Sequence, residues 1–369
     1  MNKRLFLLNG LAILGVVFNH VAGWGQIAMF QWAHRYQAVV DPSAPYSTPI
    51  YYVLLVVRQL TTFSVAAFLF AAGFFLAYMN RGTPPTSLWK VIRGRITNIL
   101  IPYAIWSVVV FVYEFVINRV RLSPLEHVWI FLTKGADGPY YFVPLLIYFY
   151  LLSPFLLPLA KTNGRRLLYA AAIIQLGTMV PRYLTIFVQS PTLDALITLT
   201  PDWMLTRWIF FYVFGLVCGF QIEPLKQWLA RFKSKLPAIV VVLGILAIIE
   251  PETIFRATAV SGWRFAPFPI ATALYAVFFI LMFLAHNTES LRFSKTLYQL
   301  GGKSYGVYLL HMKMLEFTGR MVYHFAPALL AHLVLYEAIL LVAGLGGPLL
   351  LMSLVARSPL RRYYRYLFS

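Results

Sequence analysis

An imidazole and two amides stand in a stretch of sequence that is otherwise apolar enough for a lipid bilayer. The stretch is LNGLAILGVVFNHVAGW, residues 8 to 24, and its polar members are Asn9, Asn19 and His20. A neutral imidazole titrates near physiological pH, so it can accept a proton as a base or act as a nucleophile. Hydrocarbon offers no hydrogen bonds, so we expect these side chains to face the interior of a helical bundle.

Helical spacing places Asn9 and His20 on one face. They are eleven positions apart, which at about 100° per residue brings them within about 20° of each other. Along a straight helix they are about 16 Å apart, too far for a direct hydrogen bond. Ala12, Gly15 and Gly23 adjoin this face, and small residues permit close helix packing. The sequence therefore predicts one internal face with polar groups at two depths.

Further ionisable residues fall inside apolar stretches. Each charge within a membrane costs roughly several kcal/mol and commonly marks a functional cavity. Judged by their distance from the helix ends, most of them are expected in the outer half of the membrane, with the second histidine deeper. We therefore predict a polar, mostly cationic chamber that opens outward. The residues are Arg58, Glu114, Arg182, Arg207, His311, Lys313, Glu316 and Arg320.

Each of these groups also has a purely structural interpretation. A single histidine inside a membrane is often a hydrogen bond that packs two helices together. Glu316 lies three positions from Lys313 and four from Arg320, which is the spacing of ion pairs along a helix. Arg182 and Arg207 can extend their guanidinium groups to the membrane surface.

The composition is that of a membrane protein. Of 369 residues, 60% are hydrophobic and 12% are charged, against roughly 45–50% apolar and about 25% charged in soluble domains. A net charge of +19 would suggest nucleic acid in a soluble chain. Here we expect cytoplasmic loops to hold that charge and no nucleic acid to bind. The single cysteine, Cys218, excludes an internal disulfide, and we expect no metal because CxxC spacing is missing.

Ten apolar windows are long enough to cross about 30 Å of hydrocarbon. Twenty of the 31 Lys and Arg residues lie in alternate segments that include both termini, and six, Arg264 among them, lie in the others. The positive-inside rule then places both termini in the cytoplasm. We predict an all-α, polytopic transmembrane bundle that forms a single domain over residues 1–369. The windows are 5–23, 51–79, 98–117, 139–160, 166–187, 203–222, 236–254, 267–286, 304–325 and 328–356.

Five stretches together resemble the acyltransferase-3 family of bacterial integral-membrane acyltransferases. Each motif is weak alone, but their order and the ten-helix count make the set specific, and the resemblance covers essentially the whole chain. The stretches are LNGLAILGVVFNH (8–20), FLFAAGFFLAYMNRG (68–82), VIRGRITNILIPYAIW (91–106), GPYYFVPLLIYFYLLSP (138–154) and GGKSYGVYLLHMKML (301–315).

The resemblance implies transfer of an acyl group, usually acetyl, from cytoplasmic acyl-CoA to a hydroxyl of a surface or lipid-linked saccharide. His20 matches the family histidine and is the expected base or nucleophile. The oxyanion that forms during acyl transfer needs donors, which Asn19, Arg58 or a backbone N–H can supply. The residues expected to bind substrate in the chamber are Arg58, Arg182, Arg207, His311 and Glu316.

The CoA phosphates need a cationic site on the cytoplasmic side. Lys90, Arg93 and Arg95 lie in the best matched loop, and Arg binds phosphate with two parallel hydrogen bonds. Plain positive-inside topology also accounts for such a loop. Acyl-CoA is expected as a donor substrate, and no cofactor is expected to stay bound.

This sequence departs from the family pattern at one position. The family has an Arg, ten further residues and then the histidine, whereas this chain has Asn9 at the Arg position. Asn lacks the fixed charge but suffices if only a hydrogen-bond donor is needed. We therefore predict that His20, Asn9 and Asn19 are the catalytic residues of an active enzyme.

Two other functions fit a charged cavity within a bundle. A transporter or flippase for an anionic saccharide or lipid-linked glycan is the first, although the internal repeats usual in transporter folds are not apparent. A non-catalytic subunit of a polysaccharide-assembly complex is the second. The expected location is the lipid bilayer of a bacterial inner membrane. The sequence leaves open whether the chain is a homo-oligomer and whether the acyl group is acetyl or longer.

Overall fold

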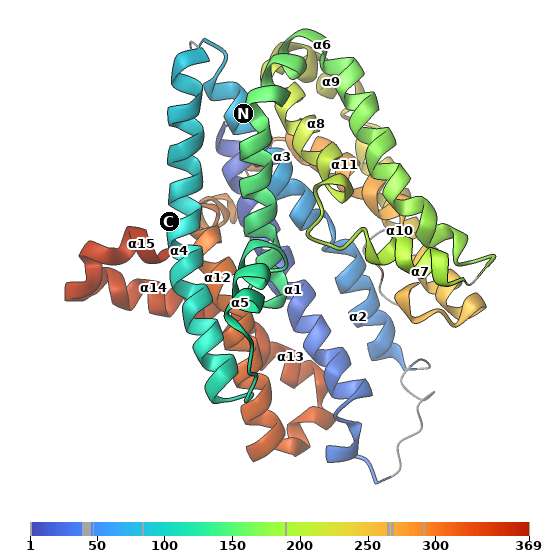
Figure 1. The fold of residues 1–369 in the computed structure, drawn as a ribbon. Coiled ribbons are helices and arrows are strands. Elements are labelled where there is room, and N and C mark those ends of the chain that lie inside the picture. The colour runs from blue at the N-terminus through green and yellow to red at the C-terminus, as the bar shows by residue number, and fades with distance from the viewer. Residues whose placement is uncertain are drawn as a thin grey trace.

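Helices make up all of the regular structure within the described residues (Figure 1). The structure is a computed structural model that describes residues 2–38, 46, 48–82, 85–188, 190–263, 266, 269–290 and 292–368. The predicted all-α class is therefore confirmed. Arg264 and the first two residues of the window 267–286 lie outside the described residues.

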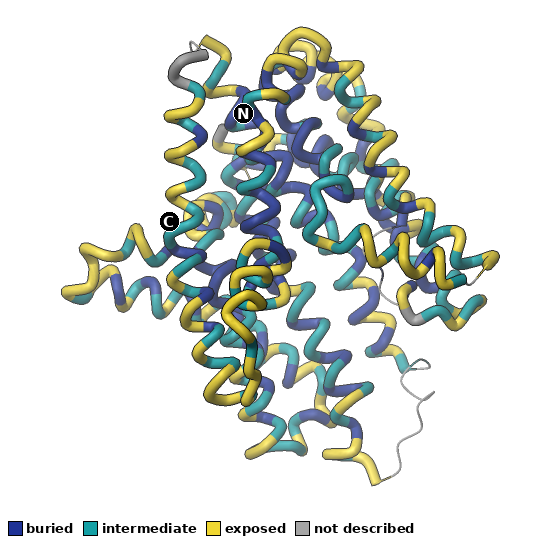
Figure 2. Tube along the Cα trace, viewed as in Figure 1, coloured by how far each residue is buried: buried dark blue, intermediate teal, exposed yellow. Residues whose placement is uncertain are grey.

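The centre of the bundle is built from four helices. α1 spans Asn2–Phe30 and packs along α12, which spans Ser294–Phe325. α3 (Phe63–Met79) packs on α1 and on α8 (Ile209–Phe220). Figure 2 shows buried positions along these helices and exposed positions along the outer ones. The other helices are α2 (Pro49–Leu60), α4 (Pro85–Val116), α5 (Pro124–Leu132), α6 (Phe142–Leu184), α7 (Pro191–Thr198), α9 (Ile222–Phe232), α10 (Leu236–Thr258), α11 (Ile270–Ala285), α13 (Leu333–Leu341), α14 (Gly347–Arg357) and α15 (Tyr364–Phe368).

The predicted window 51–79 is broken between α2 and α3. Thr61 Oγ1 donates a hydrogen bond to the carbonyl oxygen of Val57 at 2.7 Å, and Thr62 Oγ1 donates to that of Gln59 at 2.6 Å. Threonine hydroxyls that bond to the preceding turn compete with the helical ladder, and they favour an end or a bend. The break places two hydroxyl groups inside the bundle, at the level of His20.

Two predicted windows, 139–160 and 166–187, form one continuous element, α6. Its backbone leaves the helical region at Asn163, with φ −128° and ψ 37°. Figure 1 shows α6 rising on one side of this point and descending on the other, so the two windows remain two limbs. The window 203–222 is shifted instead. Its helix, α8, begins at Ile209, and α9 follows at an angle of 103°.

Among the described residues, six helical segments are long and apolar enough to cross a membrane, or seven if α8 and α9 form one bent span. The other predicted spans are not counted separately, for physical reasons that can be named. α11 has only 16 residues, α12 carries charges along its length, and both limbs of α6 fall in one 47-residue segment, Gly138–Leu184. The chain is therefore a multi-pass membrane protein, while the count of ten and the cytoplasmic location of both termini stay predictions.

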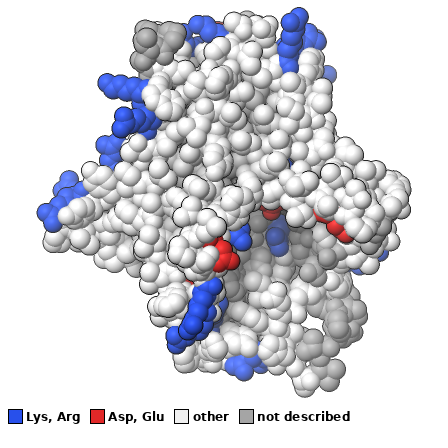
Figure 3. All heavy atoms as spheres, in the orientation of Figure 1, with Lys and Arg blue, Asp and Glu red and all other residues white. Residues whose placement is uncertain are grey.

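Basic residues mark the end of the molecule that carries the N-terminus. Figure 3 shows Lys and Arg side chains at the upper end and on the upper left flank of this face, with others at the lower end, and Figure 1 places the N-terminus at the upper end. The junction of α3 and α4 and the turn of α6 also lie there (Figure 1). Lys90, Arg93 and Lys161, in these segments, are exposed. A basic end of this kind is typical of the cytoplasmic side of a membrane protein.

The central crossing depends on two glycines that let backbones touch. A Cβ atom built on Gly10 of α1 would lie 2.0 Å from the carbonyl oxygen of Leu297. One built on Gly301 of α12 would lie 2.1 Å from the carbonyl oxygen of Phe6. Small residues at such points allow helices in a membrane to approach closely. This contact sets the register of α1 against α12.

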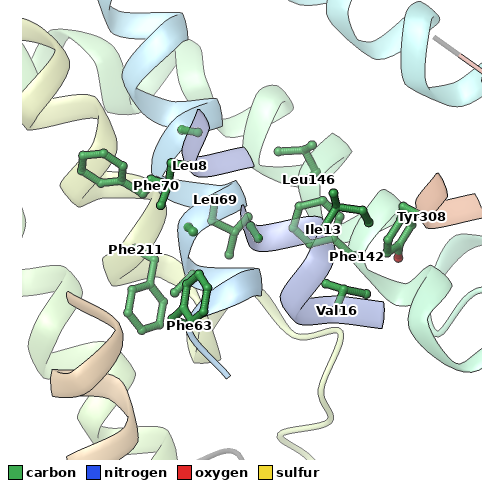
Figure 4. Close-up of a cluster of buried hydrophobic side chains, with 14 of the residues drawn as sticks. Leu8, Ile13, Val16, Phe63, Leu69, Phe70, Phe142, Leu146, Phe211 and Tyr308 are labelled. Atoms are coloured by element: carbon green, nitrogen blue, oxygen red, sulfur yellow. The ribbon is translucent and has the colours of Figure 1, made fainter. Parts of the chain in front are cut away.

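Apolar side chains fill the space beside this crossing (Figure 4). Ile13 and Val16 of α1 lie near Phe142, at the start of α6, and Tyr308 of α12. The rings of Phe142 and Tyr308 have centroids 5.8 Å apart. This packing holds the start of α6 against α12, one turn from His20.

Two neighbouring glycines of α12 test the importance of the close contact. We expect Gly301→Ala to force α1 and α12 apart and to lower the free energy of unfolding by about 1–3 kcal/mol, the usual cost of overpacking. The measurement is thermal unfolding of the detergent-solubilised protein.

Gly302→Ala is the matched control, because a Cβ atom there meets nothing within 4 Å. Removing a helical glycine at an exposed position stabilises by up to about 1 kcal/mol, so this variant should unfold at the same temperature or higher. Equal behaviour of the two variants would contradict a backbone contact at the crossing.

Candidate active site

His20 lies in the wall of a cavity of about 180 Å³. The wall combines residues of α1, the α2–α3 break, α3, the 3-10 turn η3 (Gly138–Tyr141), the start of α6, and the neighbouring helix α12. Most of the surface of this wall is apolar, although many of its residues carry one polar atom. Polar groups in such a wall interact strongly because few water molecules compete with them. Its polar side chains are those of Asn19, His20, Thr61, Thr62, Ser64, Tyr141, Asp202, Trp208 and Tyr308.

The structure brings together two histidines that are distant in the sequence. The rings of His20 and His311 have centroids 5.3 Å apart and are inclined at 44°. His311 is fully buried and is not part of the cavity wall, so it lies behind His20 as seen from the cavity. His311 was predicted to bind substrate, but its side chain does not contact this cavity.

The two amides of the α1 motif have different surroundings. Asn19 Nδ2 donates to the carbonyl oxygen of Arg58 at 2.9 Å and to Thr61 Oγ1 at 3.0 Å. Both of its N–H groups thus hold the α2–α3 break, and the predicted donation to an oxyanion would require these bonds to open. Asn9 is not in the wall of the His20 cavity. Its Oδ1 is buried and accepts no hydrogen bond among the described residues.

A larger cavity of about 680 Å³ adjoins the first. The two share Gly138, Tyr141 and Asp202 in their walls. We call the larger one the vestibule; its wall also includes Glu114 and Trp203. Figure 3 shows a hollow below the middle of this face, with Lys or Arg and Asp or Glu side chains at its wall. The His20 cavity therefore adjoins a more open space that has charged side chains in its wall.

Lys313 binds the carboxylates of three segments at the edge of the vestibule. Its Nζ lies 2.8 Å from Glu114 Oε1, 2.6 Å from Glu316 Oε2 and 3.7 Å from Asp137 Oδ2. Glu316 also pairs with Arg320 at 2.8 Å, so the ion pairs expected from the helical spacing are present. The network ties α4 and the turn η3 to α12. It accounts for Glu316 without a contact to substrate.

A loop before α8 supplies Asp202, which sequence inspection missed. Asp202 pairs with the buried Arg207, and its carbonyl oxygen accepts a hydrogen bond from Trp208 Nε1 at 2.7 Å. The only sequence signal at Asp202 was a Pro-Asp turn, which is common in loops. Arg182 and Arg207 share a small neighbouring cavity that contacts the His20 cavity through Thr62 and Trp208. These two predicted substrate-binding residues thus flank the His20 cavity.

The remaining predicted residues lie further from the cavity. Arg58 Nη1 donates to Gln26 Oε1, which ties α2 to α1. Lys90 and Arg93 are exposed on α4. Arg95 is half-buried instead, with its Nε buried and its guanidinium carbon 6.0 Å from the ring centroid of the buried Tyr150. The basic trio is therefore divided between the surface and the bundle.

The charge of Lys313 can be tested by Lys313→Met, which leaves Glu114, Asp137 and Glu316 without their shared cation. We expect the free energy of unfolding to fall by about 3 kcal/mol at neutral pH, because partly buried carboxylates then lack compensation. Burial raises the pKa of the Asp137 carboxyl, and Lys313 opposes that rise. Without Lys313 the folded protein should bind more protons than the unfolded chain. The loss should therefore shrink as the pH is lowered from about 8 to about 5.

Arg320→Met is the matched control, because Arg320 contacts only the carboxylate of Glu316 within this network and is 39% exposed. We expect Arg320→Met to lower the free energy of unfolding by less than about 1 kcal/mol. Chemical unfolding at both pH values checks the pair of variants. Equal losses, or a Lys313→Met loss that grows at the lower pH, would argue against the network.

Comparison with known proteins agrees with the resemblance in the motifs. No significant match is found among curated proteins or among solved structures. A family model described as an acyltransferase domain matches residues 2–353, nearly the whole chain. The chain, a multi-pass membrane protein with His20 at an internal cavity, belongs to the acyltransferase-3 family.

Proposed function

We propose that this membrane acyltransferase moves an acyl group, acetyl in the simplest case, from acyl-CoA to a hydroxyl group of a saccharide at His20. The observation that carries the proposal is the position of His20. It stands in the wall of a cavity that shares Gly138, Tyr141 and Asp202 with the more open vestibule. An acceptor in the vestibule can therefore extend one hydroxyl toward the imidazole.

The chemistry needs one proton to move twice. His20 accepts the proton of the saccharide hydroxyl while that oxygen attacks the thioester carbonyl. The C–S bond then breaks, and the departing thiolate takes the proton from His20, which regenerates the neutral imidazole. The mostly apolar wall strengthens the contribution of any donor to the oxyanion. Backbone N–H groups are the candidates that require neither Asn19 nor Arg58 to release a hydrogen bond.

The vestibule suits a saccharide. Its volume of about 680 Å³ lies within the usual range for ligand pockets. Glu114, Asp137 and Asp202 offer carboxylate oxygens that accept hydrogen bonds from sugar hydroxyls. Trp203 adds an aromatic surface for the apolar face of a sugar ring. A surface or lipid-linked glycan is the acceptor that fits an outward opening.

The donor enters from the opposite, basic end. CoA is made in the cytoplasm and carries phosphates, so the exposed Lys90 and Arg93 are the proposed contacts, with Arg95 further in. Asn9 lies between this end and His20 on α1. Its buried Oδ1 accepts no hydrogen bond among the described residues, and a pantetheine arm has amide N–H groups to donate. This arrangement corresponds to an enzyme of the bacterial inner membrane.

Removal of the imidazole is the direct test. We expect His20→Ala to lower transfer of labelled acetyl from acetyl-CoA to a glycan by about 10²–10⁴-fold, the usual contribution of a general base. The protein should remain folded, because the cavity can accommodate a smaller side chain. The measurement is label in the glycan after incubation of membranes that contain equal amounts of each variant.

His324→Ala is the matched control, since His324 is an exposed histidine of α12. It should transfer label at the wild-type rate. If the wild-type protein moves intact saccharide across the membrane without labelling it, the chain is a transporter. If His20→Ala transfers label at the wild-type rate, the imidazole of His20 is not a catalytic group.

Donor recognition has its own test. We expect Lys90→Gln and Arg93→Gln each to raise KM for acetyl-CoA by about 3- to 10-fold, as for loss of one charged hydrogen bond, with little change in kcat. Lys161→Gln removes another exposed cation at the basic end and should leave KM unchanged. If all three variants have the same KM as the wild-type protein, Lys90 and Arg93 do not bind the donor and serve only to orient the chain in the membrane.

A further inference from the structure

His311 is held in one tautomer by its own helix. Its Nδ1 lies 2.7 Å from the carbonyl oxygen of Tyr308 and 3.2 Å from that of Val307. Carbonyl oxygens only accept hydrogen bonds, so Nδ1 carries the proton. In a neutral imidazole the other nitrogen, Nε2, is then an acceptor.

That acceptor is buried without a partner. Nε2 of His311 makes no hydrogen bond to any other described residue, and His311 is 0% exposed. A buried acceptor left without a bond costs about 1–3 kcal/mol, so it calls for an explanation. The rings of His311 and His20 have centroids 5.3 Å apart, closer than the 6.0 Å between the rings of His311 and Tyr308. An N–H···N bond of about 2.9 Å between two imidazoles places their centroids roughly 5 Å apart.

Three polar groups near His20 already have partners of their own. The Tyr308 hydroxyl donates to the carbonyl oxygen of Pro139. Asp202 pairs with Arg207, and Arg58 donates to Gln26. His20 is therefore the donor best placed to reach Nε2 of His311. Hydrogen bonds of catalytic groups are often long or poorly aligned before substrate binds.

We propose that His311 is a positioning residue. Its Nε2 accepts a hydrogen bond from one ring N–H of His20, which turns the unprotonated nitrogen of His20 toward the cavity. The order from cavity to helix is then the hydroxyl of the acceptor, His20, His311 and the carbonyl oxygen of Tyr308. When His20 takes up a proton, the same bond stabilises the imidazolium. The catalytic consequence rests on the proposed function, whereas the hydrogen bond itself does not.

Spectroscopy tests the bond without any substrate. In protein with ¹⁵N-labelled histidine, in bilayers, the ring nitrogens of His20 are assigned by their loss in His20→Gln. We expect one fixed tautomer of His20 in the wild-type protein and in His311→Gln, whose side-chain oxygen can replace Nε2 as the acceptor. His311→Met has no comparable acceptor and should give a mixture of tautomers. A tautomer mixture in the wild-type protein, or no change in His311→Met, would overturn the proposal.

Kinetics tests the consequence. We expect His311→Met to lower kcat by about 10- to 100-fold, as for other residues that orient a reacting ligand, and to change KM for acetyl-CoA by less than about threefold. His311→Gln should restore most of kcat. Leu315→Ala, at another fully buried position of α12, controls for packing: it should lower the melting temperature but keep kcat per folded molecule. Equal kcat losses in His311→Met and His311→Gln would reduce His311 to a packing role.

The two hypotheses fail separately. If no acyl transfer is found but the tautomer of His20 depends on residue 311 as described, the histidine pair stands and the proposed reaction falls. If transfer depends on His20 but its tautomer does not depend on residue 311, the reaction stands and the positioning role falls.

Discussion

The site depends on how closely α1 approaches α12. Gly10 and Gly301 let the two backbones touch, since a Cβ atom on either would overlap a carbonyl oxygen of the other helix. The crossing fixes which residues of the two helices meet further along. Gly10 precedes His20 by ten residues and Gly301 precedes His311 by ten residues, so equal lengths of helix lead from the contact to the two rings. A shift of one residue in either helix would rotate its ring away by about 100°.

The membrane explains why so many polar groups in this bundle are paired. Lipid cannot satisfy a buried donor or acceptor, so each must find a partner within the protein. Asn19 binds the α2–α3 break, Lys313 gathers three carboxylates, and the hydroxyls of Tyr140 and Tyr308 bind carbonyl oxygens across η3 and α12. Some buried side-chain atoms nevertheless have no hydrogen bond within the described residues, and two of them, Nε2 of His311 and Oδ1 of Asn9, lie on the two helices that carry the site.

Sequence reasoning predicted the class of fold and the individual polar residues better than their arrangement. Apolar windows identify helices because hydrocarbon imposes a minimum length, and they located both limbs of α6 although the chain turns at Asn163 without a separate loop. The ion pairs of Glu316 followed from helical spacing, which is local. The meeting of His20 with His311 depends on contacts between residues nearly 300 positions apart, and no local pattern encodes it. Asp202 was missed because a Pro-Asp turn is common in loops, whether or not the loop lines a cavity.

One helix connects the chemistry at His20 with the electrostatics of the vestibule. Tyr308, His311, Lys313 and Glu316 are all on α12, within nine residues. Tyr308 forms part of the cavity wall and binds η3 at Pro139, and His311 lies behind His20. Lys313 binds the N-cap residue of η3, Asp137. The turn η3 contributes to both cavities. Because these four residues lie on one helix, any displacement of α12 would move the His311 ring and the wall between the two cavities together.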